Sequence, residues 1–172
     1  MWVFDATPLV YLATVDRLSL LSHLDEPRLV PDRVYHEVVT RGLEEGYPDA
    51  RRVERGIEEG ILDVVAVEGT DAFDRLRENP NLSDADAAVL ACAAERDATA
   101  VMDEAYGRDV AGVEGIETRG TAYLLLLLVK RGEITAEEAR QTLDEMLDAG
   151  WYCSPDLYAT LVGKFEELQG GE

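Results

Sequence analysis

The sequence predicts an α/β fold in which a mostly parallel sheet carries helices on both faces. Short apolar runs typical of buried strands alternate along the chain with helix-length segments, and this alternation is the pattern of parallel sheets. The chain has 172 residues, of which 47% are apolar, enough for one folded domain with a buried core. We therefore expect one domain over residues 1–172, with a helical C-terminal segment at about residues 121–168.

Three strands are predicted in the first half of the chain. Residues 2–4 form a short apolar run that ends at Asp5, and the segment that follows has helical spacing. A second short strand over residues 29–31 precedes a helix in which Glu37 lies beside the apolar face. A third strand is expected over residues 61–67, after a charged segment that favours helix.

The second half of the chain begins with a strong helix. Ser83 is suited to cap an alanine-rich helix over residues 84–96, and a buried strand over residues 98–102 then ends at Asp103. A further strand is expected near Ile116. Three more helices are predicted, at residues 122–129, 136–147 and 155–168.

The charge of the chain is strongly negative. The net charge is −20, and Lys130 and Lys164 are the only lysines. Proteins that bind nucleic acid normally carry a basic surface, so this composition first suggests a protein that avoids nucleic acid. An acidic, lysine-poor surface is also typical of halophilic proteins, because the Debye length falls to about 3 Å in molar salt and the repulsion is screened. Composition alone therefore does not exclude an RNA substrate.

Cysteine content and hydropathy indicate the compartment. Cys92 and Cys153 are the only cysteines, and a distant pair without a secretion signal is expected to remain reduced. The longest apolar run, residues 122–129, is far shorter than the roughly 20 residues that span a bilayer. We therefore expect a cytoplasmic protein that does not insert into a membrane.

Two acidic residues directly follow predicted strands. Asp5 and Asp103 are separated in sequence, but the carboxyl ends of parallel strands meet at one edge of the sheet, where ligands bind. Two carboxylates in one crevice repel each other unless a cation lies between them. Mg²⁺ and Mn²⁺ suit such oxygen-rich sites.

Each candidate residue also has a purely structural interpretation. Asp5 and Asp103 could cap helices, and Asp86 occupies the third-position acid of a capping box at the start of its helix. Glu37 could belong to a solvated helix face. Thr7 could bind a metal-bound water or cap the first helix. Local pattern alone does not decide between these interpretations.

Four stretches together resemble the sequence motifs of PIN-domain proteins. They are VFDATPLVYLATVDRLSLL (Val3 to Leu21), VPDRVYHEVVTRG (Val30 to Gly42), LSDADAAVLACA (Leu82 to Ala93) and AVMDE (Ala100 to Glu104). The similarity covers nearly the whole chain, and the chain resembles toxin-like ribonucleases of the VapC type. The resemblance implies a flavodoxin-like three-layer α/β/α sandwich, cleavage of single-stranded RNA with Mg²⁺ or Mn²⁺, frequent homodimers, and often a toxin role beside a small antitoxin.

The resemblance also implies a set of site residues. The catalytic acids would be Asp5, Glu37, Asp86 and Asp103, and Asp5, Asp86 and Asp103 would bind the metal. Thr7 and Glu104 would support them. The arginines that could contact phosphate are Arg41, Arg51, Arg52, Arg55, Arg108 and Arg119, although surface arginines more often form ion pairs.

Two further expectations complete the sequence-based picture. A non-catalytic PIN-like module that binds RNA or protein is the alternative to a nuclease, and the complete set of four acids argues against it. A homodimer is expected because a small domain has limited interior for all its apolar residues. The residues on which this expectation rests are Tyr123, the leucines at 124–128, Trp151, Tyr152 and Tyr158.

Overall fold

A computed structural model describes residues 1–171 of the chain. Its five strands form one parallel sheet with the order β3-β2-β1-β4-β5, so the first strand lies at the centre. The strands are β1 (Trp2–Phe4), β2 (Arg28–Pro31), β3 (Asp63–Val65), β4 (Thr99–Val101) and β5 (Thr118–Arg119). The parallel sheet that the sequence predicts is confirmed.

Helices fill the segments between the strands. In the first half they are α1 (Ala6–Thr14), the 3-10 helix η1 (Leu18–His23), α2 (Asp32–Tyr35), the π-helical turn η2 (His36–Thr40), α3 (Arg41–Glu44) and α4 (Pro48–Glu58). In the second half they are α5 (Asp71–Arg77), α6 (Asp84–Arg96), α7 (Ala105–Val113), α8 (Thr121–Lys130), α9 (Ala136–Asp148) and α10 (Pro155–Gly170).

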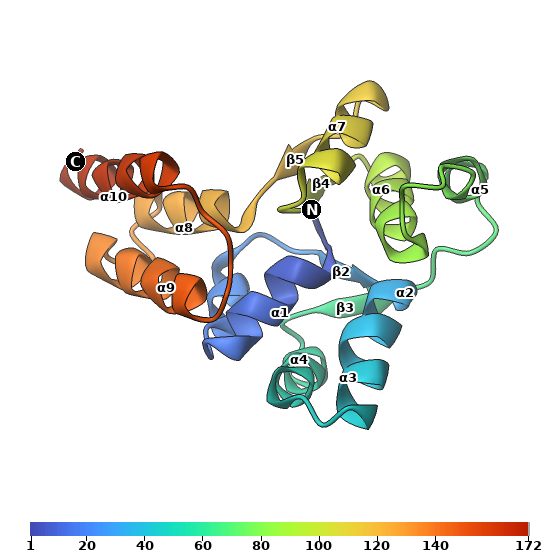
Figure 1. Ribbon diagram of the computed structural model, residues 1–172, viewed down its shortest axis with the longest axis horizontal. Helices are drawn as coiled ribbons and strands as arrows, with labels where there is room; N and C mark the ends of the chain where they lie inside the picture. The colour runs from blue at the N-terminus through green and yellow to red at the C-terminus, as the bar shows by residue number, and fades with distance from the viewer. Residues whose placement is uncertain (172) are drawn as a thin grey trace.

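The helices form a layer on each face of the sheet. Figure 1 shows α1, α3 and α4 on one side of the strands and α6, with α5 beside it, on the other. The last three helices pack on one another at one end of the molecule, where α9 also contacts α1. The architecture is therefore the three-layer α/β/α arrangement that the sequence predicts.

Small and apolar side chains explain why the central layers pack closely. Val3 and Phe4 in β1 are fully buried, as expected for a strand covered on both faces. Helix α6 contacts β1, β2 and β4, and its Ala87, Ala88 and Ala91 are fully buried. Alanine favours helix and lets the helix backbone lie near the sheet. The core therefore fixes the strand ends at which Asp5 and Asp103 lie.

The helix after β2 contains a feature that the sequence pattern did not predict. Residues 32–44 run through α2, η2 and α3 without a break, but the turn His36–Thr40 is π-helical. The backbone N–H of Arg41 donates to the carbonyl of His36, five residues earlier. Such turns are rare and frequently lie at functional sites. This turn carries Glu37.

Several boundaries differ from the sequence-based expectation. The last strand is Thr118–Arg119 rather than a strand at Ile116, and α5 lies in a segment for which no element was predicted. Among the apolar residues expected at a dimer interface, Leu124 and Trp151 are buried within the chain, whereas Tyr152 is 85% exposed. Over residues 1–171, no helix combines the length and apolar character needed to cross a bilayer.

Candidate functional site

Asp5 lies at the carboxyl end of the central strand and is almost completely buried. Its side chain is 5% exposed, and its backbone N–H donates to the carbonyl of Val101 in β4 at 3.1 Å. Asp5 stands at the N-cap position of α1, but its side chain forms no capping hydrogen bond. The structure therefore does not support a helix-capping role for the Asp5 side chain.

The surroundings of Asp5 disfavour its charged form. Burial is the main cause that raises the pKa of Asp5, to about 7, and the negative charge of Asp86 is the next. The adjacent backbone N–H of Ala6 lowers the pKa of Asp5, while the charges of Glu37 and Glu104 raise it further. Three acidic residues from different elements therefore act on one buried carboxyl group.

Asp86 forms the capping box that its spacing predicts. Its carboxylate Oδ2 accepts a hydrogen bond from the backbone N–H of Ser83 at 3.2 Å, and its own N–H donates to Ser83 Oγ at 3.0 Å. Within residues 1–171, Oδ1 of Asp86 has no hydrogen-bond partner. Because Asp86 also exerts the largest charge effect on Asp5, its capping role and a role at the site are compatible.

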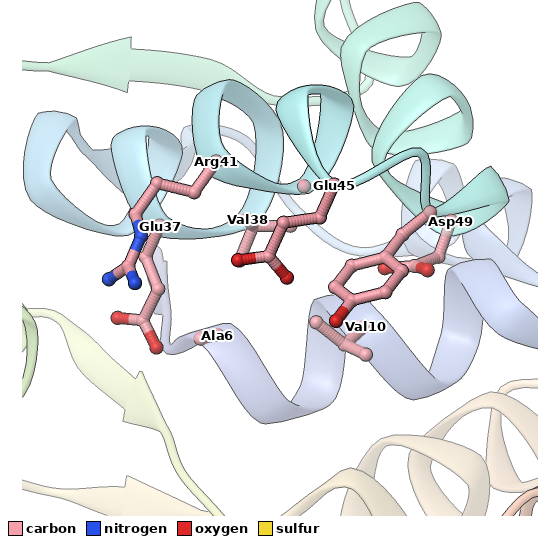
Figure 2. Close-up of a pocket in the computed structure, with 9 residues that line it drawn as sticks. Ala6, Val10, Glu37, Val38, Arg41, Glu45 and Asp49 are labelled. Atoms are coloured by element: carbon pink, nitrogen blue, oxygen red, sulfur yellow. The ribbon is translucent and has the colours of Figure 1, made fainter.

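Glu37 lies on the π-helical turn across from the start of α1. Its side chain is exposed, as is that of Arg41, and Figure 2 shows the two side chains next to each other, with the Glu37 carboxylate near Ala6. Within the described part of the chain, neither side chain forms an ion pair. A carboxylate and a guanidinium therefore stand at the mouth of the site with their polar atoms available.

Asp103 makes its contacts with the C-terminal helical segment. Its Oδ1 accepts the backbone N–H of Thr121 at 2.7 Å, and Oδ2 accepts Thr121 Oγ1 at 2.7 Å and Trp151 Nε1 at 3.2 Å. The N-cap of α8 is Gly120, whose missing Cβ would lie 3.0 Å from Asp103 Oδ1. Gly120 has no side chain that could cap α8, and the Asp103 carboxylate accepts the backbone N–H at the start of this helix instead. The structural interpretation of Asp103 as a helix cap is therefore confirmed, but the capped helix is α8 and not α7, which follows Asp103 directly.

The two supporting residues differ in their relation to Asp5. Glu104 is exposed at the start of α7, and its charge contributes to the raised pKa of Asp5. Thr7 is half-buried in the first turn of α1, and over residues 1–171 its hydroxyl has no hydrogen-bond partner. Both side chains have free polar atoms.

The residues around Asp5 fit a divalent cation in chemical type. Oxygen ligands from carboxylates suit Mg²⁺ and Mn²⁺, and a cation would relieve the repulsion that raises the pKa of Asp5. Within residues 1–171, however, no three acidic, histidine or cysteine side chains are already arranged as a metal-binding group. A shared ion between Asp5 and Asp103 therefore remains a prediction.

Two hollows meet at Glu37 and Arg41. The larger, of about 470 Å³, lies between α1 and the α3–α4 turn, and includes Ala6 in its lining. The smaller, of about 350 Å³, includes Ser83 and Ala85 at the start of α6. Ala6 directly follows Asp5, and Ala85 directly precedes Asp86. The larger hollow therefore lies beside Asp5 and the smaller one beside Asp86. Arg41 is the predicted phosphate-binding arginine that lines both hollows.

Three of the other predicted arginines are engaged in local structure. Arg52 donates to two carbonyls at the end of α1, at 2.7 and 3.0 Å. Arg51 pairs with Glu54 at 3.3 Å, and Arg119 pairs with Glu117 at 2.9 Å. Arg119 also stacks on an aromatic ring of α8. These contacts are those of ordinary surface arginines.

The remaining two arginines lie in different places. Arg55 borders a hollow with Asp16 and Ile61. Ile61 lies just before β3 begins, so this hollow is at the amino ends of the strands, whereas Asp5 is at a carboxyl end. The Arg108 guanidinium lies beside Gly120, close to the Asp103 carboxylate. Arg108 therefore lies on the same edge as the acids, whereas Arg55 does not.

The sequence-based interpretation missed the partners of Asp103. Thr121 and Trp151 lie 18 and 48 residues further along the chain, so no local spacing links them to Asp103. The only sequence signal was indirect, because Gly120 leaves the start of α8 without a side chain able to cap it.

Comparison with known proteins identifies the family. A family model described as a PIN domain matches residues 1–167. No curated protein and no solved structure matches the chain. PIN domains are typically metal-dependent nucleases, which agrees with a buried acid among acids at the carboxyl edge of a parallel sheet. The chain belongs to the PIN-domain family.

Proposed function

We propose that this protein is an endoribonuclease that cleaves single-stranded RNA with Mg²⁺ or Mn²⁺. The observation that carries the proposal is the burial of Asp5 among the charges of Asp86, Glu37 and Glu104. A purely structural carboxylate at 5% exposure would be expected to have hydrogen-bond donors or a basic partner. Apart from the backbone of Ala6, the neighbours that act on Asp5 are acids.

Each acid then has a defined part in the proposed reaction. Asp5 and Asp86 would hold the ion, Asp86 through the oxygen that its capping box leaves open. Asp103 would contribute through Oδ1, which accepts one hydrogen bond and retains a second lone pair. A bound divalent ion supplies a nucleophilic water at neutral pH and relieves charge on the phosphate oxygens.

Residues at the mouth of the site would position the RNA. Glu37 would orient the attacking water, and Glu104 and Thr7 would hold waters at the rim. Arg41 would bind a phosphate oxygen beside the scissile bond, since its guanidinium fork matches phosphate geometry. As the family resemblance implies, direct hydrolysis would leave 5′-phosphate and 3′-hydroxyl ends.

The partners belong to the same proposal. On the family resemblance, the protein would be the toxin of a toxin–antitoxin pair and would form a homodimer. Among the residues on which the expectation of a dimer rests, Tyr152 is 85% exposed and would be covered by such an interface. The strongly acidic surface is expected to separate subunits in dilute buffer, because two chains of charge −20 repel. The dimer is therefore expected in molar salt, where light scattering would measure its mass.

Cleavage of a single-stranded RNA in Mn²⁺ or Mg²⁺ at high salt tests the activity. Asp5→Asn and Asp86→Asn should each abolish cleavage, and asparagine at position 86 keeps an oxygen for the Ser83 N–H. Asp63→Asn is the matched control, because Asp63 is exposed at the first position of β3, on the opposite edge of the sheet. Undiminished cleavage by Asp5→Asn, or after chelation of the metal, would contradict the proposal.

A non-catalytic PIN-like module is the second candidate. The hydrogen bonds of Asp103 and the capping box of Asp86 favour it, because both are sufficient structural reasons for these acids. Calorimetric titration with Mn²⁺ separates the two candidates. A nuclease should bind the ion and lose that binding in Asp5→Asn, whereas a module without a metal site should show no binding in either protein.

A further inference from the structure

We propose that the larger hollow, between α1 and the α3–α4 turn, binds one unpaired RNA base and favours bases that carry an exocyclic amino group. We call it the base pocket; its volume is about 470 Å³. This inference rests on the proposed function, because it concerns the substrate of the same site.

The position of the base pocket relates it to the acids. Ala6, in its lining, directly follows Asp5, and Glu37 belongs both to the pocket and to the group of acids that act on Asp5. Figure 2 shows the Glu37 and Arg41 side chains at one end of the hollow. A phosphate held at this end would therefore place the base of a neighbouring nucleotide over the pocket.

The walls of the base pocket suit a flat aromatic ring. Val10 from α1 and Val38 from η2 line it with apolar surface, and Tyr47 contributes a ring that is 53% exposed. Unpaired bases stack on exposed aromatic side chains in proteins that bind single-stranded RNA.

The backbone at Tyr47 is restricted by the proline that follows. Tyr47 precedes Pro48, and its backbone is extended, with φ −73° and ψ 126°, as the residue before a proline prefers. Interaction with the nearby Glu45 carboxylate is the main cause that raises the pKa of the Tyr47 phenol. A backbone restricted before binding loses less conformational entropy when a base stacks on Tyr47.

The turn that carries Tyr47 is held close to the helix before it. A Cβ on Gly42 would lie 2.7 Å from the Cβ of Ala50, so only glycine allows α3 and α4 to approach this closely. Ala50 is fully buried. Packing therefore fixes the position of the turn that carries Tyr47 relative to α3.

Charge decides which base the pocket would take. Glu45 and Asp49 line it together with Glu37, and Figure 2 shows the Glu37 and Glu45 carboxylates on the side that faces α1. Carboxylates accept hydrogen bonds from amino groups such as N4 of cytosine. Uracil has a carbonyl oxygen at that position, which a carboxylate repels. The acidic lining also disfavours a phosphate inside the pocket, so phosphate binding is left to Arg41 at its end.

Binding of oligo(rC) and oligo(rU) hexanucleotides tests the proposal, because cytosine and uracil have the same ring size. The full-length Asp5→Asn variant is used so that the RNA is not cut, and fluorescence anisotropy is measured with Mg²⁺ at about 1 M KCl, where phosphate contacts are weakened. We expect oligo(rC) to bind at least about 10-fold more tightly than oligo(rU). Equal binding of the two would overturn the selectivity.

Substitutions in the same background test the individual contacts. Tyr47→Ala should weaken oligo(rC) binding by about 5-fold or more through the lost stacking, and Tyr47→Phe should restore it. The double variant Glu45→Gln, Asp49→Asn should bring the two hexanucleotides within about 2-fold of each other. Val113→Ala, which removes an exposed apolar side chain at the end of α7, outside the lining of the base pocket, should change nothing. Unchanged binding by Tyr47→Ala would show that the base lies elsewhere.

The result is separable from that for the nuclease activity. If the wild-type protein cleaves RNA but the hexanucleotides bind equally, the base pocket is wrong and the nuclease proposal stands. If the wild-type protein does not cleave RNA but Tyr47 and Glu45 control binding of oligo(rC), the nuclease proposal fails and the base pocket stands. Absence of binding by either hexanucleotide would overturn the base pocket.

Discussion

Asp103 and Thr121 join the edge of the sheet to the C-terminal helices through two hydrogen bonds of 2.7 Å. One satisfies a backbone N–H at the start of α8, and the other reaches the Thr121 hydroxyl, which is fully buried. Because hydrogen bonds to a charged acceptor are the stronger kind, this pair ties α8 to the strand end that bears the acidic site.

Asp103→Asn is therefore expected to destabilise the protein as well as to impair cleavage. The asparagine amide has one acceptor oxygen, so at least one of the three groups that donate to Asp103 loses its acceptor. The free energy of unfolding should fall by about 1–3 kcal/mol. Chemical denaturation measures the change. The matched control is Asp109→Asn, since Asp109 is exposed in α7. If both variants unfold at the same denaturant concentration, these hydrogen bonds contribute no stability.

Asp5 should make the stability of the metal-free protein depend on pH in a particular sense. The pKa of Asp5 is about 7 in the folded protein against 3.8 for an unperturbed aspartate, so the folded state holds the proton more tightly between these two pH values. The contribution of Asp5 to the free energy of unfolding is fully present below about pH 3.8 and is lost as pH rises through 7. The loss amounts to about 1.4 kcal/mol per pH unit, or about 4 kcal/mol at most.

The comparison that isolates this effect is wild type against Asp5→Asn in chelator. Asparagine carries no charge at any pH, so the variant should gain stability relative to wild type as pH rises from 5 to 8. Denaturant unfolding at each pH gives the difference. A difference that stays constant with pH would mean that the pKa of Asp5 is not raised.

Divalent ions should release protons when they bind. An ion favours the ionised form of Asp5, so with a pKa of about 7 binding should release about one proton at pH 6 and about a tenth of a proton at pH 8. Titration calorimetry with Mn²⁺ in two buffers of different ionisation enthalpy measures this number. Equal release at both pH values would show that Asp5 is not a ligand.

Arg41 should affect substrate binding more than the chemical step. Arg41→Ala is expected to raise KM by about 10-fold with little change in kcat, because it removes a phosphate contact beside the scissile bond. Arg55→Ala is the matched control, since Arg55 is also exposed but borders the opposite edge of the sheet. A similar effect of both substitutions would indicate general electrostatic attraction rather than a contact at the site.

Elements with a local signature could be predicted from the sequence. The helix Asp84–Arg96 has the predicted bounds, because a capping serine and a run of buried alanines mark it. The apolar run before Asp5 likewise gave β1 correctly. Helix α5 was missed because its short segment buries only Phe73 and Leu76, too few residues for a helical period to be recognised.

The candidate site was predictable only in part for a related reason. The acids could be found because each follows or lies on an element with a clear pattern. The directions in which their side chains point could not be predicted, because they depend on contacts between distant residues. The hydrogen bond between Asp103 and Trp151, for example, joins residues 48 apart. The base pocket depends on the turn before Pro48 and on the close contact of Gly42 with Ala50, which are tertiary features.

Because the turn at His36–Thr40 is π-helical, the position of Glu37 depends on the number of residues in this helix as well as on their types. A π turn holds one residue more than an α-helical turn, so it corresponds to a single-residue insertion within a continuous helix. Deletion of one residue between Val38 and Thr40 would let residues 32–44 close as a regular α-helix of nearly the same phase at both ends. Glu37 would then keep its identity but face a different direction relative to Arg41. An insertion of one codon is thus sufficient to acquire this geometry, and the loss of one codon is sufficient to remove it.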